Sequence, residues 1–440
     1  MSIKGQSIIQ PGPNKAIPGK PLVFLKSNTT SKPDLEINQT PFILGRSNTV
    51  CGYKEDVISN RHCVIIECTP LDSDLTNIKK FCTIDKSTNG TYINNERTQR
   101  GQAQEIRCYD ELSVLRPHVD KDSVSYCFID LQVFEVENTA CNVFKKYEIG
   151  KFLGSGGAGV VREVTNGGEK FAMKILLVLD LSEKKSKNVE RECDLLKKLD
   201  HKNIVKFIEC LNGSYFKYIV MEYVEGHDLF HLIFTNKLMN EKYIRNIAKQ
   251  LFEALKYLHS LGVIHRDIKP ENVMITKDQI VKLTDFGFGK KVDDTHYAET
   301  LCGTDMYAPP EILRGVVYDG FKTDVWSAGV LMFVMSTKEY PFVFNDEDDA
   351  EVKAVGHILK NEICPNKDFN ERSEMLKDLI GNMLVLDPQK RLGFATCLEH
   401  EFFEDDKTNV DFPINCQQKR MGELFGYSQS KSAFCIFYTI

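Results

Sequence analysis

Val263-Ile264-His265-Arg266-Asp267-Ile268-Lys269-Pro270-Glu271-Asn272-Val273 is the stretch that decides the fold, together with the Asp285-Phe286-Gly287 that follows it. Each polar residue in it could separately be a turn or capping residue. In this order, they predict one shared site. We expect Asp267 to accept a proton from a substrate hydroxyl. Asn272 and Asp285 would supply the oxygen ligands that Mg²⁺ prefers alongside phosphate oxygens.

A glycine-rich run precedes this stretch, with the sequence Gly154-Ser155-Gly156-Gly157-Ala158-Gly159-Val160-Val161. Because glycine has no side chain, the backbone amides of such a run can approach phosphate oxygens. By itself the run also suits a tight turn or a dinucleotide-binding loop. Strand-like residues flank it on both sides and no helix is predicted at its end, which argues against a dinucleotide-binding loop.

A lysine lies in an apolar strand after the glycine-rich run, in the sequence Phe171-Ala172-Met173-Lys174. An ammonium group there is costly unless it meets an anion, and the α- and β-phosphates of ATP would supply one. Glu192 lies in a predicted amphipathic helix and could pair with Lys174. It could also be a surface charge of that helix.

In this order, the motifs of residues 147–404 resemble those of a eukaryotic protein kinase domain, which implies an α+β bilobal fold. The resemblance implies ATP and Mg²⁺ as cofactors, with Mg²⁺ on Asn272 and Asp285. It implies as catalytic residues Asp267, Lys174, Lys269 and Glu192. It implies as ATP-binding residues Leu153, Gly154, Ser155, Gly156, Gly157, Ala158, Gly159, Val161, Ala172, Lys174, Met221, Glu222, Val224, Asp228 and Asn272.

The same resemblance assigns supporting roles outside the motifs. Asp324 would brace the catalytic loop and Arg391 would pair with Glu311. A hydrophobic spine would comprise His265, Phe286, Leu196 and Phe207.

Substrate choice and activation rest on further positions. Lys269, with Thr304 facing it, resembles serine/threonine rather than tyrosine kinases. Arg266 predicts that the geometry of the site is set by a phosphate on the activation segment. The candidates for this phosphorylation are Thr300 and Thr304. Asp305 and Pro309 stand where the family usually has proline and alanine, so the peptide-docking platform departs from the family pattern at these two positions.

Two acidic residues near the expected peptide groove, Glu271 and Asp228, predict a preference for arginine three residues before the target Ser/Thr. The partners implied are therefore proteins with a serine or threonine in a basic context.

The region before the kinase motifs, residues 22–136, contains short β-prone runs separated by turn residues, which predicts an all-β sandwich. Three of its turns resemble those of a forkhead-associated (FHA) domain: Gly45-Arg46-Ser47, Ser59-Asn60-Arg61-His62 and Ser87-Thr88-Asn89-Gly90-Thr91. The resemblance implies binding of phosphothreonine. The phosphate would be held by Arg46, Ser59 and Asn60, and the peptide backbone by Thr88 and Asn89. His62 would brace these loops from inside.

Composition limits the other function classes. The formal net charge of -6 gives no positive field for a polyanion, so we expect no direct nucleic-acid partner. No signal peptide or membrane-spanning run is found, which predicts a soluble protein without a membrane partner. The 14 cysteines show no CxxC pair, which predicts free thiols in a reducing, intracellular compartment.

Together these features predict a multidomain chain: a flexible tail at 1–21, the FHA domain at 22–136, a linker at 137–146, the kinase domain at 147–404 and a C-terminal tail at 405–440. The combination resembles the checkpoint kinase 2 family of DNA-damage signalling. That resemblance implies a nuclear location, with the cytoplasm left open, and dimerisation through FHA binding of phosphothreonine on a second copy.

The first 40 residues contain no cluster of Ser-Gln or Thr-Gln steps; such steps occur only at Thr98-Gln99 and Ser428-Gln429. A partner's phosphothreonine could therefore take the place of a second copy. Two alternatives stay open. One is an FHA kinase of another signalling pathway, and the other is a phosphopeptide-binding scaffold with an inactive kinase domain.

Overall fold

The computed structural model describes residues 22–28, 32–68, 80–117, 123–156, 159–178, 193, 196–285, 290–291, 305–315, 318–343 and 356–404. The chain folds as two compact units that divide near Lys145. The predicted tails 1–21 and 405–440 lie outside the described residues.

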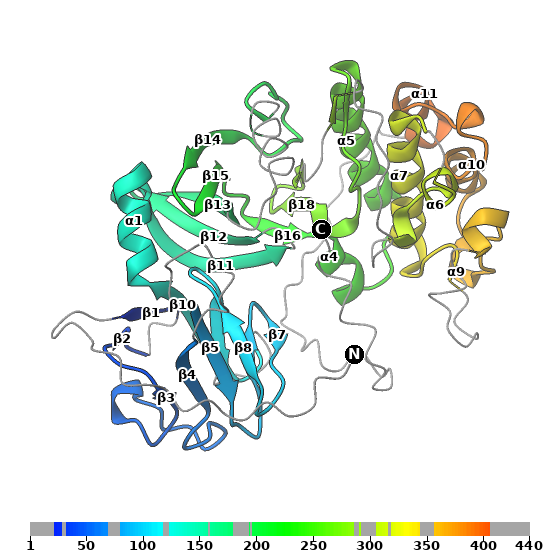
Figure 1. Ribbon diagram of the computed structural model, residues 1–440. Coiled ribbons are helices and arrows are strands. Elements are labelled where there is room, and N and C mark those ends of the chain that lie inside the picture. Colours follow the sequence, from blue (N-terminus) through cyan, green and yellow to red (C-terminus); the bar gives the residue numbers. More distant parts are fainter. Residues whose placement is uncertain are drawn as a thin grey trace. The chain divides into compact units, whose positions relative to one another are not determined.

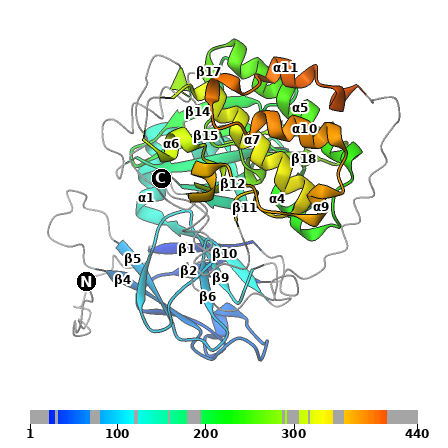
Figure 2. The same ribbon diagram turned by 90° about the vertical axis from the view of Figure 1, so that its right-hand side faces the viewer.

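The first unit is a sandwich of two antiparallel sheets (Figure 2). One sheet has the order β2-β1-β10-β9-β6-β7 and the other the order β3-β4-β5-β8. Side chains alternate between the core and the outer face, as along β5, so the apolar residues of both sheets meet inside. The strands are β1 Val23–Ser27, β2 Leu35–Ile37, β3 Phe42–Leu44, β4 Cys63–Cys68, β5 Lys80–Asp85, β6 Thr91–Ile93, β7 Glu96–Arg97, β8 Ala103–Ile106, β9 Glu111–Val114 and β10 Val124–Asp130.

The end of this unit differs from the sequence-based expectation. Residues 22–136 were predicted to form an all-β sandwich, but β10 ends at Asp130 and helix α1 spans Leu131–Cys141. The Asp130 carboxylate caps the helix by accepting a hydrogen bond from the amide of Gln132 at 2.9 Å. Residues 137–146, predicted as a linker, lie in α1 and in the short helix α2, Val143–Lys146.

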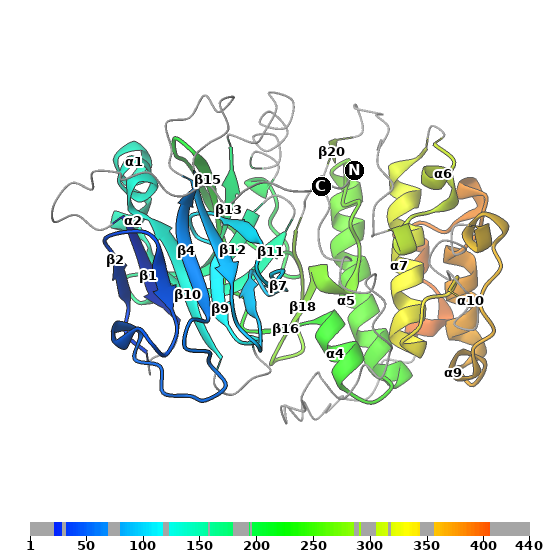
Figure 3. The same cartoon turned by 60° about the horizontal axis from the view of Figure 1, so that its bottom comes forward.

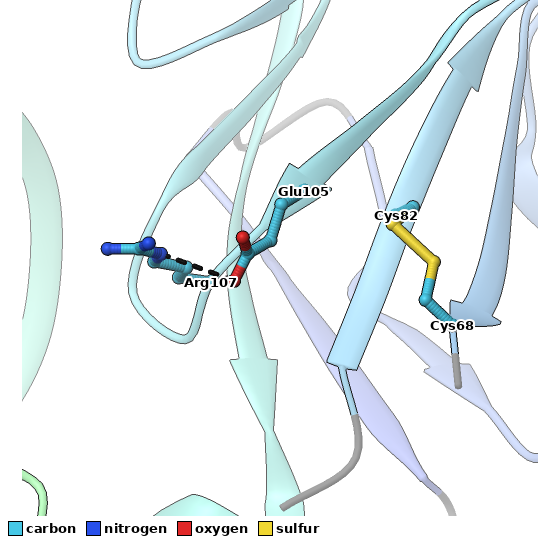
Figure 4. Close-up of a disulfide and its surroundings, with 4 residues drawn as sticks. All are labelled: Cys68, Cys82, Glu105 and Arg107. Atoms are coloured by element: carbon cyan, nitrogen blue, oxygen red, sulfur yellow. Dashed lines mark hydrogen bonds and ion pairs between the residues drawn. A yellow bond between two sulfur atoms is a disulfide. The ribbon is translucent and has the colours of Figure 1, made fainter. Parts of the chain in front are cut away.

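The expectation of free thiols throughout is wrong for one pair. Cys68 and Cys82 lie on the neighbouring strands β4 and β5 and are joined by a disulfide, which Figure 4 shows beside Glu105 and Arg107. Sequence spacing could not predict this pair because antiparallel pairing of β4 with β5 brings the two residues together.

The second unit begins with a five-stranded antiparallel sheet of order β11-β12-β13-β15-β14. Its strands are β11 Glu148–Gly156, β12 Gly159–Asn166, β13 Glu169–Leu177, β14 Phe207–Asn212 and β15 Phe216–Glu222. Of the glycine-rich run, Gly154 and Gly156 lie at the end of β11 and Gly159 begins β12. A Cβ on Gly159 would come within 2.0 Å of the Ile175 carbonyl oxygen, so the pairing with β13 requires glycine there.

Helices follow this sheet, and α5 and α7 pack side by side within them (Figures 1 and 3). Helix α7 is buried on nearly all its sides, as its continuous apolar sequence predicts. The helices are α4 Leu229–Thr235, α5 Glu241–Ser260, α6 Pro310–Leu313, α7 Gly320–Thr337, α9 Lys367–Asn370, α10 Glu374–Met383 and α11 Phe394–Leu398. In the described part of the chain, no helix has the length and apolar character needed to cross a bilayer.

Short strands and 3-10 turns line the junction between this sheet and the helices. The three-stranded sheet β16-β18-β19 comprises Gly226–Asp228, Val273–Thr276 and Val281–Leu283. Strand β17, Val263–Ile264, pairs with β20, Lys290–Lys291. The residues between β17 and β18 are therefore held at both ends, and they include Asp267 and Asn272.

Candidate active site

The loop between β17 and β18 brings three predicted site residues together around one carboxylate. Lys269 Nζ lies 2.9 Å from Asp267 Oδ2. The Asn272 side-chain amide donates to both the carbonyl and Oδ2 of Asp267, each at 2.8 Å. The Asp267 carboxylate is one-third exposed, so a substrate hydroxyl could reach it while the two neighbours fix its orientation.

The Asn272 side chain is oriented with its nitrogen toward Asp267, and a carboxamide oxygen is therefore left as an acceptor. The backbone carbonyl of Asn272 accepts from the amide of Thr284, which comes directly before Asp285. The two predicted metal-binding residues thus belong to connected segments. An amide oxygen and a carboxylate are hard ligands that suit Mg²⁺.

Asp285 also contacts the predicted phosphate-binding lysine. Lys174 Nζ lies 2.8 Å from Asp285 Oδ1. The neighbouring ammonium lowers the pKa of Asp285, so this carboxylate stays ionised. Asp285 has a φ of 52°, in the left-handed region that non-glycine residues rarely adopt. Such backbone conformations cluster at functional sites, where they fix the direction of the side chain.

Asp324 anchors the backbone of the same loop, as predicted. Its carboxylate accepts from the amides of His265 and Arg266, each at 2.9 Å. A third contact comes from His259 Nε2 at 2.9 Å. Sequence reasoning missed His259, whose only signal was a polar residue at the end of an otherwise apolar helix face. Asp324 is 1% exposed, so these contacts form away from water.

Several of the predicted ATP-binding residues lie on adjacent strands. Lys174 on β13 faces Val161 on β12 and Ile219 on β15, and Ala172 faces Met221. Some of these paired strand residues line a cavity. The predicted spine residues Leu196 and Phe207 line it as well. The whole lining is Lys174, Leu196, Val205, Phe207, Ile219, Met221 and Asp285. The structure therefore brings the predicted ATP-binding residues Met221 and Lys174 and the predicted metal ligand Asp285 around one cavity.

The edge residues of this site have identifiable partners. Glu222, at the end of β15, forms an ion pair with Lys282 at 2.6 Å. Asp228 caps helix α4, with Oδ1 accepting from the amide of His231 at 2.6 Å. This cap uses one acceptor position of the carboxylate, so further positions remain for the predicted contacts with ATP or peptide. Leu153 on β11, a predicted ATP-binding residue, is 42% exposed.

Some predicted residues lie outside the described residues: Gly157, Ala158, Glu192, Phe286, Thr300 and Thr304. For Asp305 the backbone is described, in a 3-10 turn that spans Asp305–Tyr307. Pro309 caps helix α6, which carries Glu311. Glu311 binds the Arg391 guanidinium through two hydrogen bonds of 2.5 and 2.7 Å, which confirms the predicted pair.

Glu271 follows Pro270 in the 3-10 turn Pro270–Asn272. Burial raises the pKa of Glu271, and the nearby carboxylates of Asp267 and Asp228 raise it further. Its Oε2 is buried and has no hydrogen-bond partner among the described residues. A buried carboxylate with an unsatisfied oxygen would gain most from a cation, because the charge is poorly solvated there.

In the first unit, the three predicted FHA turns meet at one end of the sandwich. The amide of Arg46 donates to the Ser59 carbonyl at 3.2 Å, and the amide of Thr88 donates to Ser59 Oγ at 3.3 Å. The Asn89 side chain donates to the Val57 carbonyl at 2.7 Å. The Asn60 carbonyl accepts from Ser47 Oγ at 2.6 Å. All five predicted phosphothreonine-site residues belong to these connected turns.

His62 supports these turns from inside, as predicted. It is 0% exposed, accepts from the Ser59 amide through Nδ1 at 3.3 Å and contacts the Gly90 carbonyl through Nε2 at 2.8 Å. Burial lowers the pKa of His62, which favours the neutral ring that these two contacts require. A Cβ on Gly45 would come within 2.3 Å of the Asn60 carbonyl oxygen, so only glycine allows the first two turns to approach.

Arg46 also has a partner that the sequence did not indicate. Its Nη1 lies 2.7 Å from Asp56 Oδ1, and the Asp56 side chain is 98% exposed. The guanidinium therefore already holds an anionic group at the predicted phosphate site.

Comparison with known proteins gives matches over both units. The model of the protein kinase domain matches residues 147–403, and the model of the FHA domain matches residues 42–114. The serine/threonine-protein kinase cds1 of Schizosaccharomyces pombe is 36% identical over 365 residues, which cover 79% of this chain and 78% of that protein. The probable serine/threonine-protein kinase fhkC of Dictyostelium discoideum is 32% identical, and the match covers 87% of this chain but only 66% of that relative's length.

A solved structure of similar architecture is that of Rad53 residues 1-466 in complex with AMP-PNP. It is 27% identical, with a TM-score of 0.52, and the match covers 87% of this chain and 99% of that one. The similarity extends over both the sandwich and the bilobal unit.

Proposed function

Because this chain belongs to the FHA-domain-containing serine/threonine protein kinases of the checkpoint kinase 2 family, we propose that it transfers the γ-phosphate of Mg²⁺-bound ATP to protein serine and threonine. The observation that carries this proposal is the position of Asp267, held by Lys269 and Asn272 and accessible to a hydroxyl. AMP-PNP in the Rad53 structure supports a nucleotide in the site.

In the proposed mechanism, Asp267 accepts the proton of the substrate hydroxyl as its oxygen attacks the γ-phosphorus. Lys269 lies next to that carboxylate, where its ammonium would offset negative charge on the transferring phosphoryl group. Lys174 would exchange Asp285 for the α- and β-phosphates. Asn272 and Asp285 would hold the metal, which when bound would supply positive charge to the phosphates.

Recruitment is the proposed role of the first unit. Arg46, Ser59 and Asn60 would bind a phosphothreonine on a partner or on a second copy, while Thr88 and Asn89 would hold its backbone. The convergence of the three turns supports this assignment. A phosphorylated Thr300 or Thr304 would pair with Arg266 and order the activation segment. On the basis of its similarity to this family, we propose that the protein acts in DNA-damage checkpoint signalling in the nucleus.

A transfer assay tests the enzyme. Purified chain is incubated with Mg²⁺, ATP and peptides that carry arginine or alanine three residues before a serine. We expect transfer with a preference for arginine, and a loss of about 10²–10⁴-fold in Asp267→Asn. Asp278→Asn, an exposed carboxylate in the turn between β18 and β19, is the matched control. Wild-type rates in Asp267→Asn would contradict the mechanism. Phosphopeptide binding without transfer would support the inactive scaffold instead.

A further inference from the structure

Two thiols lie in contact inside the sheet-bearing lobe of the kinase unit. Cys193 Sγ and Cys210 Sγ are 3.3 Å apart. A disulfide bond is about 2.05 Å long, so the two sulfurs need to move about 1.3 Å closer to bond. The pair is distinct from Cys68 and Cys82, which belong to the first unit.

The surroundings of this pair bring it close to the predicted nucleotide site. Cys193 belongs to a buried cluster with Leu176 and Ile219, and Cys210, Phe207 and Met221 pack against that cluster. Cys210 lies on β14 and faces Ile219 on β15 in the sheet register. Phe207, Ile219 and Met221 also line the cavity beside Lys174.

Exposure differs between the two thiols. Cys193 is 3% exposed, whereas Cys210 is partly exposed. An oxidant would therefore meet Cys210 first, and the buried Cys193 would act as the resolving thiol. A partly exposed thiol with a second thiol in contact is the arrangement that redox-sensitive sites use.

We propose that Cys193 and Cys210 form a reversible disulfide that hydrogen peroxide induces and that lowers kinase activity. The Cys210 thiolate attacks one peroxide oxygen, which gives a sulfenic acid and releases hydroxide. Cys193 then attacks that sulfur, forms the S–S bond and releases the hydroxyl group as water after proton transfer. In total, two thiols and one peroxide give one disulfide and two waters.

The expected effect on activity rests on the proposed function. Cys193 directly follows Glu192, the predicted partner of Lys174. Lys174 contacts Asp285 in the structure and would have to exchange that contact for phosphates during turnover. A covalent bond from Cys193 to β14 would restrain the segment next to Glu192 during this exchange. We expect slower transfer with little change in peptide KM.

The experiment combines disulfide mapping with activity on the full chain. Protein is treated with hydrogen peroxide, alkylated, digested and analysed by mass spectrometry. We expect a peptide pair that joins Cys193 to Cys210, a Tm higher by roughly 5 °C, and activity that falls several-fold and returns with dithiothreitol. Cys210→Ser should retain basal activity and resist peroxide. Cys364→Ser, a partly exposed thiol elsewhere in the kinase unit, should respond like the wild type.

The possible outcomes distinguish failure of the disulfide proposal from failure of the proposed kinase function. Absence of the Cys193–Cys210 peptide, or equal inhibition of Cys210→Ser by peroxide, would overturn the proposal while reduced protein still transferred phosphate. Full activity of protein shown to carry the bond would overturn the regulatory role. An inactive reduced protein would instead refute the proposed kinase function, and mapping would still decide whether the bond forms.

Discussion

The carboxylate of Asp324 accepts a hydrogen bond from the backbone amide of Arg266 at 2.9 Å, and Arg266 has a φ of 70°. An arginine rarely adopts this left-handed conformation without surrounding support. The same carboxylate binds the amide of His265 and the ring of His259, so helix α7 fixes the loop just before Asp267. The position of the predicted base therefore depends on a residue far from it in the chain.

Asp324→Asn should slow transfer about 10²-fold, because the amide cannot accept from all the donors that face it and the loop would shift. The buried donor left without a partner should lower the free energy of unfolding by about 1–3 kcal/mol. Steady-state kcat and urea unfolding check both effects. Asp378→Asn, whose carboxylate binds His400 on the surface, is the control. Wild-type kcat in Asp324→Asn would contradict the anchoring role.

Arg391→Met should destabilise the kinase unit by about 3–5 kcal/mol, because it leaves the Glu311 carboxylate buried without its guanidinium. The loss includes the cation–π contact of Arg391 with Trp326, at 4.9 Å from the ring centroid. Urea unfolding measures the change. Lys390→Met, which removes an exposed cation 3.7 Å from Asp387, should alter stability by less than about 1 kcal/mol. Similar losses in both variants would argue against a special role for the buried pair.

Glu271→Gln should raise Tm at neutral pH. Burial raises the folded-state pKa of Glu271 above its ordinary value of 4.5, so ionisation of this carboxyl group opposes folding. Protonated Glu271 therefore contributes to the stability of the folded wild type, fully below pH 4.5. This contribution is lost as the pH rises through the folded-state pKa of Glu271. Melting curves at pH 5 and pH 8 should show the larger gain of Glu271→Gln at pH 8. An equal gain at both values would refute this linkage.

The same substitution tests substrate choice. If the Glu271 carboxylate binds an arginine before the target residue, Glu271→Gln should raise KM for an arginine peptide several-fold and leave KM for its alanine counterpart unchanged. In the wild type, KM for the arginine peptide should fall as pH rises, since Glu271 becomes ionised. Glu225→Gln is the control, because that carboxylate is exposed and pairs with Lys277. A variant that keeps the full arginine preference would exclude Glu271 from this role.

Asp56→Asn should tighten phosphothreonine-peptide binding several-fold. A phosphate at Arg46 must displace the Asp56 carboxylate, which also repels it, and an exposed ion pair contributes only about 0–1 kcal/mol to stability. Calorimetric titration of the full chain with phosphorylated and unphosphorylated peptide measures the change in affinity. Arg46→Ala should abolish binding of the phosphorylated peptide. Glu105→Gln, whose carboxylate pairs with Arg107, is the matched control. Weaker binding in Asp56→Asn would mean that Asp56 orients Arg46 for the ligand.

Much of the kinase unit was predictable from sequence, because its chemistry lies in short, ordered motifs. Asp267, Lys269 and Asn272 lie within one loop, so their proximity follows from chain connectivity alone. The order of sandwich and bilobal unit was also predictable, from short alternating strands followed by helical periodicity. Helix α1 was missed because the run Leu131 to Phe134 is as apolar as a strand, and the capping by Asp130 overrides that local preference.

The amino-acid sequence by itself determined the type of each functional group and its order: the carboxylates, amide and lysine of the catalytic stretch, and the arginine and hydroxyl groups of the FHA turns. Only the tertiary structure decided which distant residues meet. His259 with Asp324, Asp56 with Arg46 and Cys193 with Cys210 are contacts set by packing of separate elements. Packing depends on the whole core, whereas a motif carries only its own local geometry.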